Sequence, residues 1–224
     1  MMNGILVVDK PKGPTSHDIC QYFKRTLPVR KVGHAGTLDP MATGVLVILL
    51  DGATKLQSVF LGKDKEYEFT MKLGETTDTY DAEGKLLEQK PVPDDYERKL
   101  KELLPQFSGE ILQTPPAFSA IKKNGKPLYK LAREGRVVQP EPRKIQIRLL
   151  EILKTDLPEA TLRCRCSSGT YIRSLAHDLG QRLGCGAHVT ALRRLASEPF
   201  TIEEALPVDW PSGPGSAKNQ ARRA

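Results

Sequence analysis

One loop of the sequence presents a carboxylate beside a histidine. Residues 33–44 contain three glycines and Pro40 and present His34 and Asp39 just before an apolar run at residues 45–50. An ionised aspartate can attack an electrophilic carbon or remove a proton. An aspartate before proline is also typical of a simple turn, and the spacing alone leaves both interpretations open.

An arginine lies at the start of a predicted helix further along the chain. Residues 171–183 carry apolar side chains at helical spacing (Ile172, Leu175, Leu179 and Leu183), and Gly184 is expected to end the helix. Arg173 faces nearly away from this apolar stripe, so it is expected either in solvent or against a carboxylate in a cleft. In the second case it would favour the ionised form of that carboxylate.

A third candidate is aromatic. Residues 65–73 alternate between apolar and polar side chains, which predicts a strand with Tyr67 on its apolar face. On this pattern alone, Tyr67 is most simply a core residue whose hydroxyl needs a partner.

Familiar cofactor motifs are missing from the sequence. It contains no glycine-rich motif for a dinucleotide or a nucleoside triphosphate. Cys164, Cys166, Cys185 and His188 could hold zinc, but Cys164 and Cys166 share the buried face of a predicted strand and lack the usual ligand spacing. We therefore expect no metal and no cofactor. Asp78 and Asp81 are expected to be solvated turn residues.

Charge is unevenly distributed along the 224 residues. The net charge is +7, and residues 115–148 contain nine basic and two acidic side chains. A segregated excess of this kind favours a polyanionic partner, although a solvated surface would explain it too. The sequence shows no membrane-spanning run and no export signal, and its four cysteines are expected to be reduced in the cytoplasm.

The elements that position these residues form no regular repeat. Strands are expected at 5–8, 45–50, 65–73, 144–153 and 160–167, and helices after Thr15, at 94–107 and at 171–183. Thr15 and Asp18 form a capping-box pattern. This mixture indicates an α+β fold. The basic tail at 211–224 is expected to be disordered.

Several separated blocks resemble one known family. Lys10-Pro11 with Gly13, Thr15 and Ser16, the loop at 33–44, and residues 65–67, 73–81, 114–122, 132–135, 169–175 and 192–194 are similar, in order, to motifs of the bacterial tRNA pseudouridine-55 synthases. The resemblance reaches about Asp209. Glu198 replaces an expected glycine, and the family's small C-terminal RNA-binding domain is expected to be absent.

The resemblance implies roles for individual residues. Asp39, Arg173 and Tyr67 would be catalytic, with Tyr67 stacking on the target base. His34, Tyr67, Tyr171, Leu192 and Lys10 would bind the substrate nucleotide. Contacts to the RNA backbone would come from Lys122, Lys123, Lys126, Lys130, Arg133, Arg193 and Arg194.

The resemblance also implies a fold and a reaction. The expected fold is that of pseudouridine synthases, a mixed and mainly antiparallel sheet flanked by helices, with a catalytic domain at 1–210 and an RNA-binding insertion at about 94–142. The expected reaction is isomerisation of uridine 55 in the tRNA T-arm, by a cytoplasmic monomer without cofactor. Alternatives are action on another RNA, or RNA binding and folding without catalysis.

Overall fold

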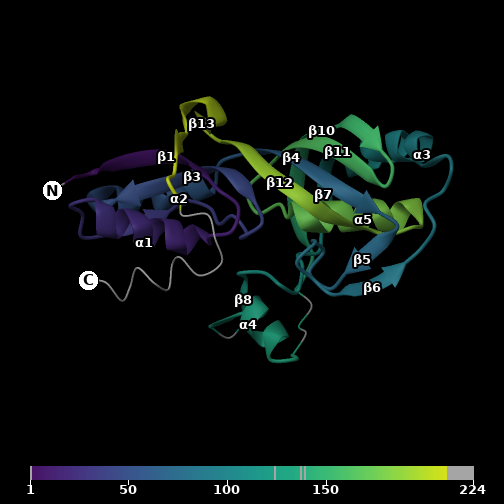
Figure 1. Cartoon of the computed structure of the whole chain (residues 1–224), viewed down its shortest axis with the longest axis horizontal. Helices are drawn as coiled ribbons and strands as arrows, with labels where there is room; N and C mark the ends of the chain where they lie inside the picture. Colours follow the sequence, from purple (N-terminus) through teal and green to yellow (C-terminus); the bar gives the residue numbers. More distant parts are fainter. Residues whose placement is uncertain (1, 124, 137, 139, 211–224) are drawn as a thin grey trace.

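The computed structural model describes residues 2–210 except 124, 137 and 139. A sheet of ten strands runs through the molecule, and its main path follows the order β14-β1-β3-β12-β4-β11-β10-β7, with β2 on β3 and β13 on β12 (Figure 1). Strands β1–β14 and β3–β12 pair in parallel, whereas every other pair of this sheet is antiparallel. The expected mixed, mainly antiparallel α+β architecture is confirmed.

The strands have the following bounds: β1 Gly4–Lys10, β2 Val32–His34, β3 Thr43–Leu50, β4 Lys65–Leu73, β5 Glu75–Thr77, β6 Leu86–Gln89, β7 Gly109–Gln113, β8 Lys122–Lys123, β9 Lys126–Pro127, β10 Arg143–Asp156, β11 Glu159–Cys166, β12 Ala187–Ser197, β13 Phe200–Thr201 and β14 Leu206–Pro207. The α-helices are α1 Ser16–Thr26, α2 Gln57–Leu61, α3 Tyr96–Leu103, α4 Leu128–Arg133 and α5 Ile172–Leu183. Short 3-10 turns cover Asp51–Leu56, Leu104–Phe107 and Ile202–Glu204.

The central strands follow the sequence pattern closely. All residues of β3 after Thr43 are buried, as the continuous apolar run predicts. Strand β4 alternates, with Tyr67, Phe69, Met71 and Leu73 buried. Strands β11 and β12 pair with its two edges, so β4 is placed in the middle of the sheet.

Helix α5 covers the sheet beside β12 and β4, with α3 packed against it (Figure 1). Its C-terminus is at Gly184, which adopts φ +87°, a conformation that glycine adopts without the steric cost of a Cβ. The capping box at the start of α1 is present, with Thr15 as the N-cap and Asp18 as its partner.

The segment expected to be an insertion has two different parts. Helix α3 belongs to the body, where Tyr96 and Leu100 are buried in the main core. Elements β8, β9 and α4 instead form a small lobe that projects below the body in Figure 1. Leu128 and Ala132 are buried within this lobe.

In the described part of the chain, no helix has the length and apolar character needed to cross a bilayer. The expected disorder of the tail concerns residues 211–224, which lie outside the described residues.

Candidate active site

The loop between β2 and β3 is shaped by two glycines, Gly36 near its start and Gly44 just inside β3. Gly36 and Gly44 adopt φ values of +107° and +102°. A Cβ on Gly44 would lie 2.2 Å from the carbonyl oxygen of Arg194. Glycine at position 44 therefore allows β3 and β12 to approach closely where the loop enters the sheet.

The residues next to Asp39 are fixed by buried polar side chains. Ser16 at the start of α1 donates to the carbonyl of Leu38 at 3.1 Å and accepts from its N–H at 2.8 Å. On the other side of Asp39, the ammonium of Lys10 donates to the carbonyls of Pro40 and Ala42 at 3.3 and 2.7 Å. These contacts leave the backbone of Asp39 little freedom.

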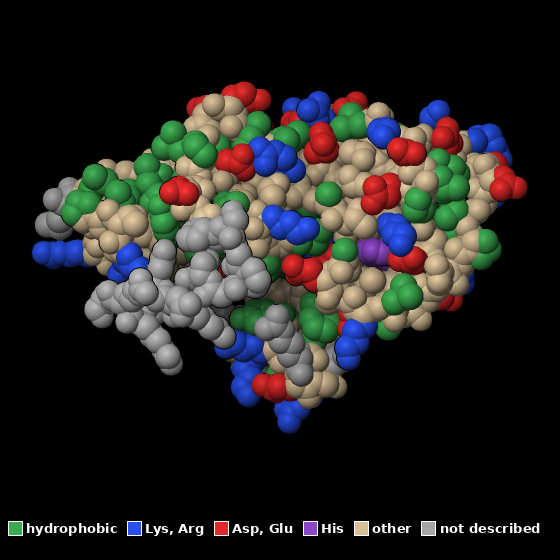
Figure 2. All heavy atoms as spheres, in the orientation of Figure 1, with side chains coloured by type: hydrophobic (Ala, Val, Ile, Leu, Met, Phe, Trp, Pro, Cys, Tyr) green, Lys and Arg blue, Asp and Glu red, His purple; other side chains and the backbone are tan. Residues whose placement is uncertain are grey.

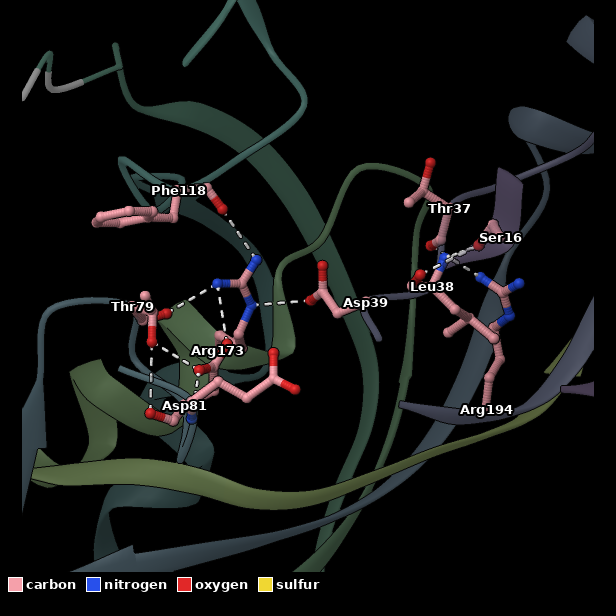
Figure 3. A network of polar contacts seen from close by, with 10 residues as sticks. Ser16, Thr37, Leu38, Asp39, Thr79, Asp81, Phe118, Arg173 and Arg194 are labelled. Atoms are coloured by element: carbon pink, nitrogen blue, oxygen red, sulfur yellow. Dashed lines mark hydrogen bonds and ion pairs between the residues drawn. The ribbon is translucent and has the colours of Figure 1, made fainter. Parts of the chain in front are cut away.

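Arg173 and Asp39 meet as an ion pair. The Nε of Arg173 lies 2.9 Å from Oδ2 of Asp39 (Figure 3). The Arg173 side chain is 5% exposed, while that of Asp39 is 35% exposed. A solvent-accessible carboxylate held by a buried guanidinium is fixed in position by a charge-assisted hydrogen bond and can still be reached by a substrate. The alternative position for Arg173, in solvent, is excluded.

A second carboxylate completes the network. Asp81 is 4% exposed, and its Oδ2 lies 3.3 Å from Nη1 of Arg173. Arg173 also donates to the carbonyls of Thr79 and Phe118, at 2.8 and 3.1 Å (Figure 3). The expectation that Asp81 is a solvated turn residue is therefore wrong. The turn that contains it folds inward because the Arg173 guanidinium needs partners in the interior.

Asp81 is held in turn by its own neighbours. Its Oδ1 accepts from the hydroxyl of Thr79 at 2.6 Å and from the N–H of Glu83 at 3.0 Å. Burial, with Asp81 and Asp39 nearby, raises the pKa of Glu83. In the sequence, Asp81 shares a turn pattern with Asp78, and only its place in the motif at 73–81 distinguishes it.

Tyr67 lies close to a second buried arginine. The Cα of Tyr67 is opposite that of Arg194 in the β4–β12 register, and opposite Cys164 on the other side. Burial raises the pKa of the Tyr67 hydroxyl, with the Arg194 guanidinium acting in the opposite direction. Arg194 donates to the carbonyls of Val45 at 2.7 Å and Gly36 at 3.2 Å.

Arg194 and Lys10 differ from their predicted roles. Arg194 is 1% exposed and Lys10 fully buried, so in this conformation neither side chain reaches an RNA phosphate or a nucleotide in the pocket. Both instead satisfy backbone carbonyls beneath the loop that carries Asp39. Burial is the main reason that the pKa of Lys10 falls to about 8. The motif resemblance identified these positions, but it did not show which way their side chains point.

The remaining predicted pocket residues lie on three different elements. Tyr171 is the N-cap of α5, with its backbone N–H and carbonyl both bonded to the side chain of Gln113. The Arg143 guanidinium lies 4.8 Å above the Tyr171 ring. Leu192 is buried on β12 opposite Phe69. His34 ends β2, and burial lowers its pKa.

The basic side chains predicted to contact RNA lie in different surroundings. Lys126 and Lys130 are exposed on the projecting lobe, over which Lys and Arg side chains gather in Figure 2. Arg193 is paired with Asp9 through two contacts, of 2.6 and 3.0 Å. The side chains of Lys122, Lys123 and Arg133 lie outside the described residues.

A metal site finds no support in the cysteine positions. Cys164 and Cys166 are fully buried on the inner face of β11, as the strand pattern predicts. Within residues 2–210, leaving aside the three gaps, no group of three or more His, Cys, Asp or Glu side chains is placed to hold an ion.

Known proteins match nearly the whole described chain. The N-terminal domain of the TruB family of pseudouridylate synthases matches residues 24–172. The C-terminal domain of tRNA pseudouridylate synthase B matches residues 173–209, which here form α5, β12 and the strands after it. The tRNA pseudouridine synthase B of Opitutus terrae is 48% identical over 93% of this chain and 86% of its own length. That of Stutzerimonas stutzeri is 50% identical over 93% and 68%.

A solved structure agrees with the sequence matches. A chain of a Cbf5-Nop10-Gar1 complex superposes with a TM-score of 0.71 at 34% identity over 92% of this chain. This chain spans about half of that protein, 52% of its length. The ion pair of Asp39 with Arg173, the sheet that carries it and these matches lead to one conclusion: the chain belongs to the TruB family of pseudouridylate synthases.

Proposed function

We propose that the protein isomerises uridine 55 in the T-arm of tRNA to pseudouridine, with Asp39 as the catalytic carboxylate. The observation that carries the proposal is the ion pair between buried Arg173 and accessible Asp39, in a chain that is 48% identical to a tRNA pseudouridine synthase B. Family membership supports the reaction class, and the geometry supports the choice of carboxylate.

The reaction places clear demands on the site. The N1–C1′ bond of uridine breaks, the base turns, and a C5–C1′ bond forms, while C5 loses a proton and N1 gains one. Nothing is oxidised or reduced, so a carboxylate that stays ionised can supply the required nucleophile or base. Arg173 pairs with Asp39 and orients its carboxylate, and the Asp81 carboxylate and the Thr79 carbonyl hold Arg173.

Reaching the base requires that it leave its stacked position in the RNA loop, at a cost of a few kcal/mol. Stacking on an aromatic ring returns about 1–3 kcal/mol. We assign this platform to Tyr67, with Tyr171, Leu192 and His34 around the nucleotide. The exposed Lys126 and Lys130 of the lobe would bind phosphates and orient the RNA.

The segment that leads into this lobe, residues 113–118, is hydrogen-bonded to the start of α5. Gln113 bonds both backbone groups of Tyr171, and the Ser174 hydroxyl donates to the Thr114 carbonyl at 2.8 Å. Arg173 itself donates to Phe118. We infer that phosphate contacts on the lobe are thereby linked to α5, the helix that carries Arg173.

Pseudouridine mapping on tRNA transcripts incubated with the pure protein tests the proposal. We expect one modified position, in the T-loop, and none in a transcript with cytidine there. Modification elsewhere would favour action on another RNA. Tight tRNA binding without any product would favour the non-catalytic alternative.

The same proposal includes a cytoplasmic monomer. Size-exclusion chromatography with light scattering, with and without a T-arm stem-loop, tests the monomer. A dimer in both samples would contradict it.

A further inference from the structure

Tyr80 lies between two residues that hold Arg173. The preceding residue, Thr79, offers its carbonyl to Arg173, and the following residue, Asp81, offers its carboxylate. Any rotation of the turn at Tyr80 therefore moves two of the guanidinium's partners at once.

The backbone at Tyr80 is in an unfavourable conformation. Its φ is +62°, and Asp51 is the only other non-glycine with positive φ in the described chain. Asp51 has a local reason, because its carboxylate accepts the N–H groups of Arg30 and Lys31 at 2.8 Å each. An aromatic residue rarely adopts this region unless the surrounding structure holds it there.

A ring stack holds Tyr80. Its phenol ring stacks on the imidazole of His177, with 3.8 Å between the centroids and 13° between the planes. His177 is four residues after Arg173 on α5, which is about one helical turn. The stack therefore joins the Thr79–Asp81 segment to α5 about one helical turn away from Arg173.

Backbone contacts link the same turn to the sheet. The N–H of Tyr80 donates to the carbonyl of Thr77, and its own carbonyl accepts from the N–H of Val189 on β12. These bonds fix where the chain passes, while the ring stack fixes how the turn meets α5.

We propose that the Tyr80–His177 stack is a positioning device that presses the Thr79–Asp81 turn onto Arg173. Tyr80 and His177 are then positioning residues for the reaction on Asp39, acting through Arg173. The inference rests on the proposed function. Because reaction rates depend steeply on the placement of reacting groups, a loosened turn slows the chemical step more than it weakens RNA binding.

Two variants of Tyr80 distinguish the effect of its ring from the effect of its backbone conformation. Tyr80→Asn keeps a residue that tolerates positive φ but removes the ring, and Tyr80→Phe keeps the ring. We expect Tyr80→Asn to lower the single-turnover rate about tenfold or more. Affinity for a T-arm stem-loop should change less than about threefold, and Tyr80→Phe should stay within about threefold of the parent rate.

His177→Ala removes the same stack from the helix side, where alanine is well tolerated. It should slow the reaction to the same extent as Tyr80→Asn, and the double variant should be no slower than either, because both remove one interaction. Phe200→Ala is the matched control, since it removes a different ring contact, that of Phe200 with Phe60, whose planes are tilted by 38° with 5.6 Å between the centroids. That variant should keep the parent rate.

A second readout does not need turnover. The Nε–H signal of Arg173 in nitrogen-15 spectra, assigned through Arg173→Lys, reports the bond to Asp39. We expect it to shift or broaden in Tyr80→Asn and His177→Ala and to stay in place in Tyr80→Phe and Phe200→Ala. An unchanged rate or an unchanged Arg173 signal in both ring-removing variants would overturn the inference. Failure of the proposed function itself is distinct, because then the parent makes no pseudouridine.

Discussion

Two buried arginines lie close to the loop that carries Asp39, and their surroundings differ. Arg173 pairs with two carboxylates, Asp39 and Asp81. Arg194 donates to the carbonyls of Gly36, Thr37 and Val45, and no described carboxylate lies within ion-pair distance of it. One arginine fixes a charge that can react, and the other fixes the backbone that presents it.

Lys10 resembles Arg194, because its buried charge also meets backbone carbonyls. The positive charge of Arg194 is one of the causes that lower the pKa of Lys10. Carbonyl dipoles compensate a buried cation less completely than a carboxylate does, so such a site costs stability when it is charged. In return, Lys10 and Arg194 fix the backbone of the loop that carries Asp39.

The largest expected effect comes from the charge on Asp39. Asp39→Asn is nearly isosteric and removes the ionisable group, so we expect the single-turnover rate to fall by about a thousandfold or more. Binding of a T-arm stem-loop should stay within about tenfold. A rate above a hundredth of the parent's would show that Asp39 is not the reacting carboxylate.

Exchanging each arginine for lysine tests the comparison directly. Arg173→Lys replaces a planar fork by a point charge, and we expect about a hundredfold slower reaction. The lysine ammonium can still pair with Asp39 and Asp81, so the loss of unfolding free energy should be smaller than for Arg194→Lys, although carbonyl partners are lost in both variants. Arg194→Lys leaves carbonyls unsatisfied in the interior, and we expect it to lower the unfolding free energy by about 2–4 kcal/mol. Urea unfolding and single-turnover rates should therefore rank the two variants in opposite order, and the same order in both assays would contradict the distinction.

Lys10 gives a prediction with a defined pH window. Its pKa is lowered from 10.5 to about 8, so between these values the unfolded chain binds more protons than the folded one. The unfolding free energy of the parent, relative to Lys10→Met, should be constant below pH 8 and rise by about 3 kcal/mol up to pH 10.5. Taking the difference cancels the titration of tyrosines and cysteines. A difference that stays flat across the window would mean that the Lys10 charge is fully compensated.

Asp81→Asn should have the smallest effect. The amide can still accept from Thr79, while Arg173 loses one of its two carboxylates. We expect the reaction to slow about tenfold, because Arg173 keeps Asp39 but is held less firmly. A loss as large as that of Asp39→Asn would instead give Asp81 a direct part in the chemistry.

The sequence predicted the elements well where one physical signal dominated. The alternation at 65–73 and the apolar run at 45–50 became β4 and β3 because burial on one face or on both faces fixes those patterns. The capping box at Thr15 and the glycine at position 184 marked helix ends through local chemistry. Pairing partners such as β3 with β12 required the folded chain, because 150 residues separate Thr43 from Arg193.

For the site, the sequence by itself determined which side chains can react. The glycine-rich loop with Asp39 and the helix start with Arg173 were identified by residue type and motif. Tertiary structure alone decided the environment of each charge: it buried Asp81 against Arg173, turned Lys10 and Arg194 toward backbone carbonyls, and stacked Tyr80 on His177. The physical reason is that the state of a buried polar group depends on its partners in space, and those partners come from segments that are remote in sequence.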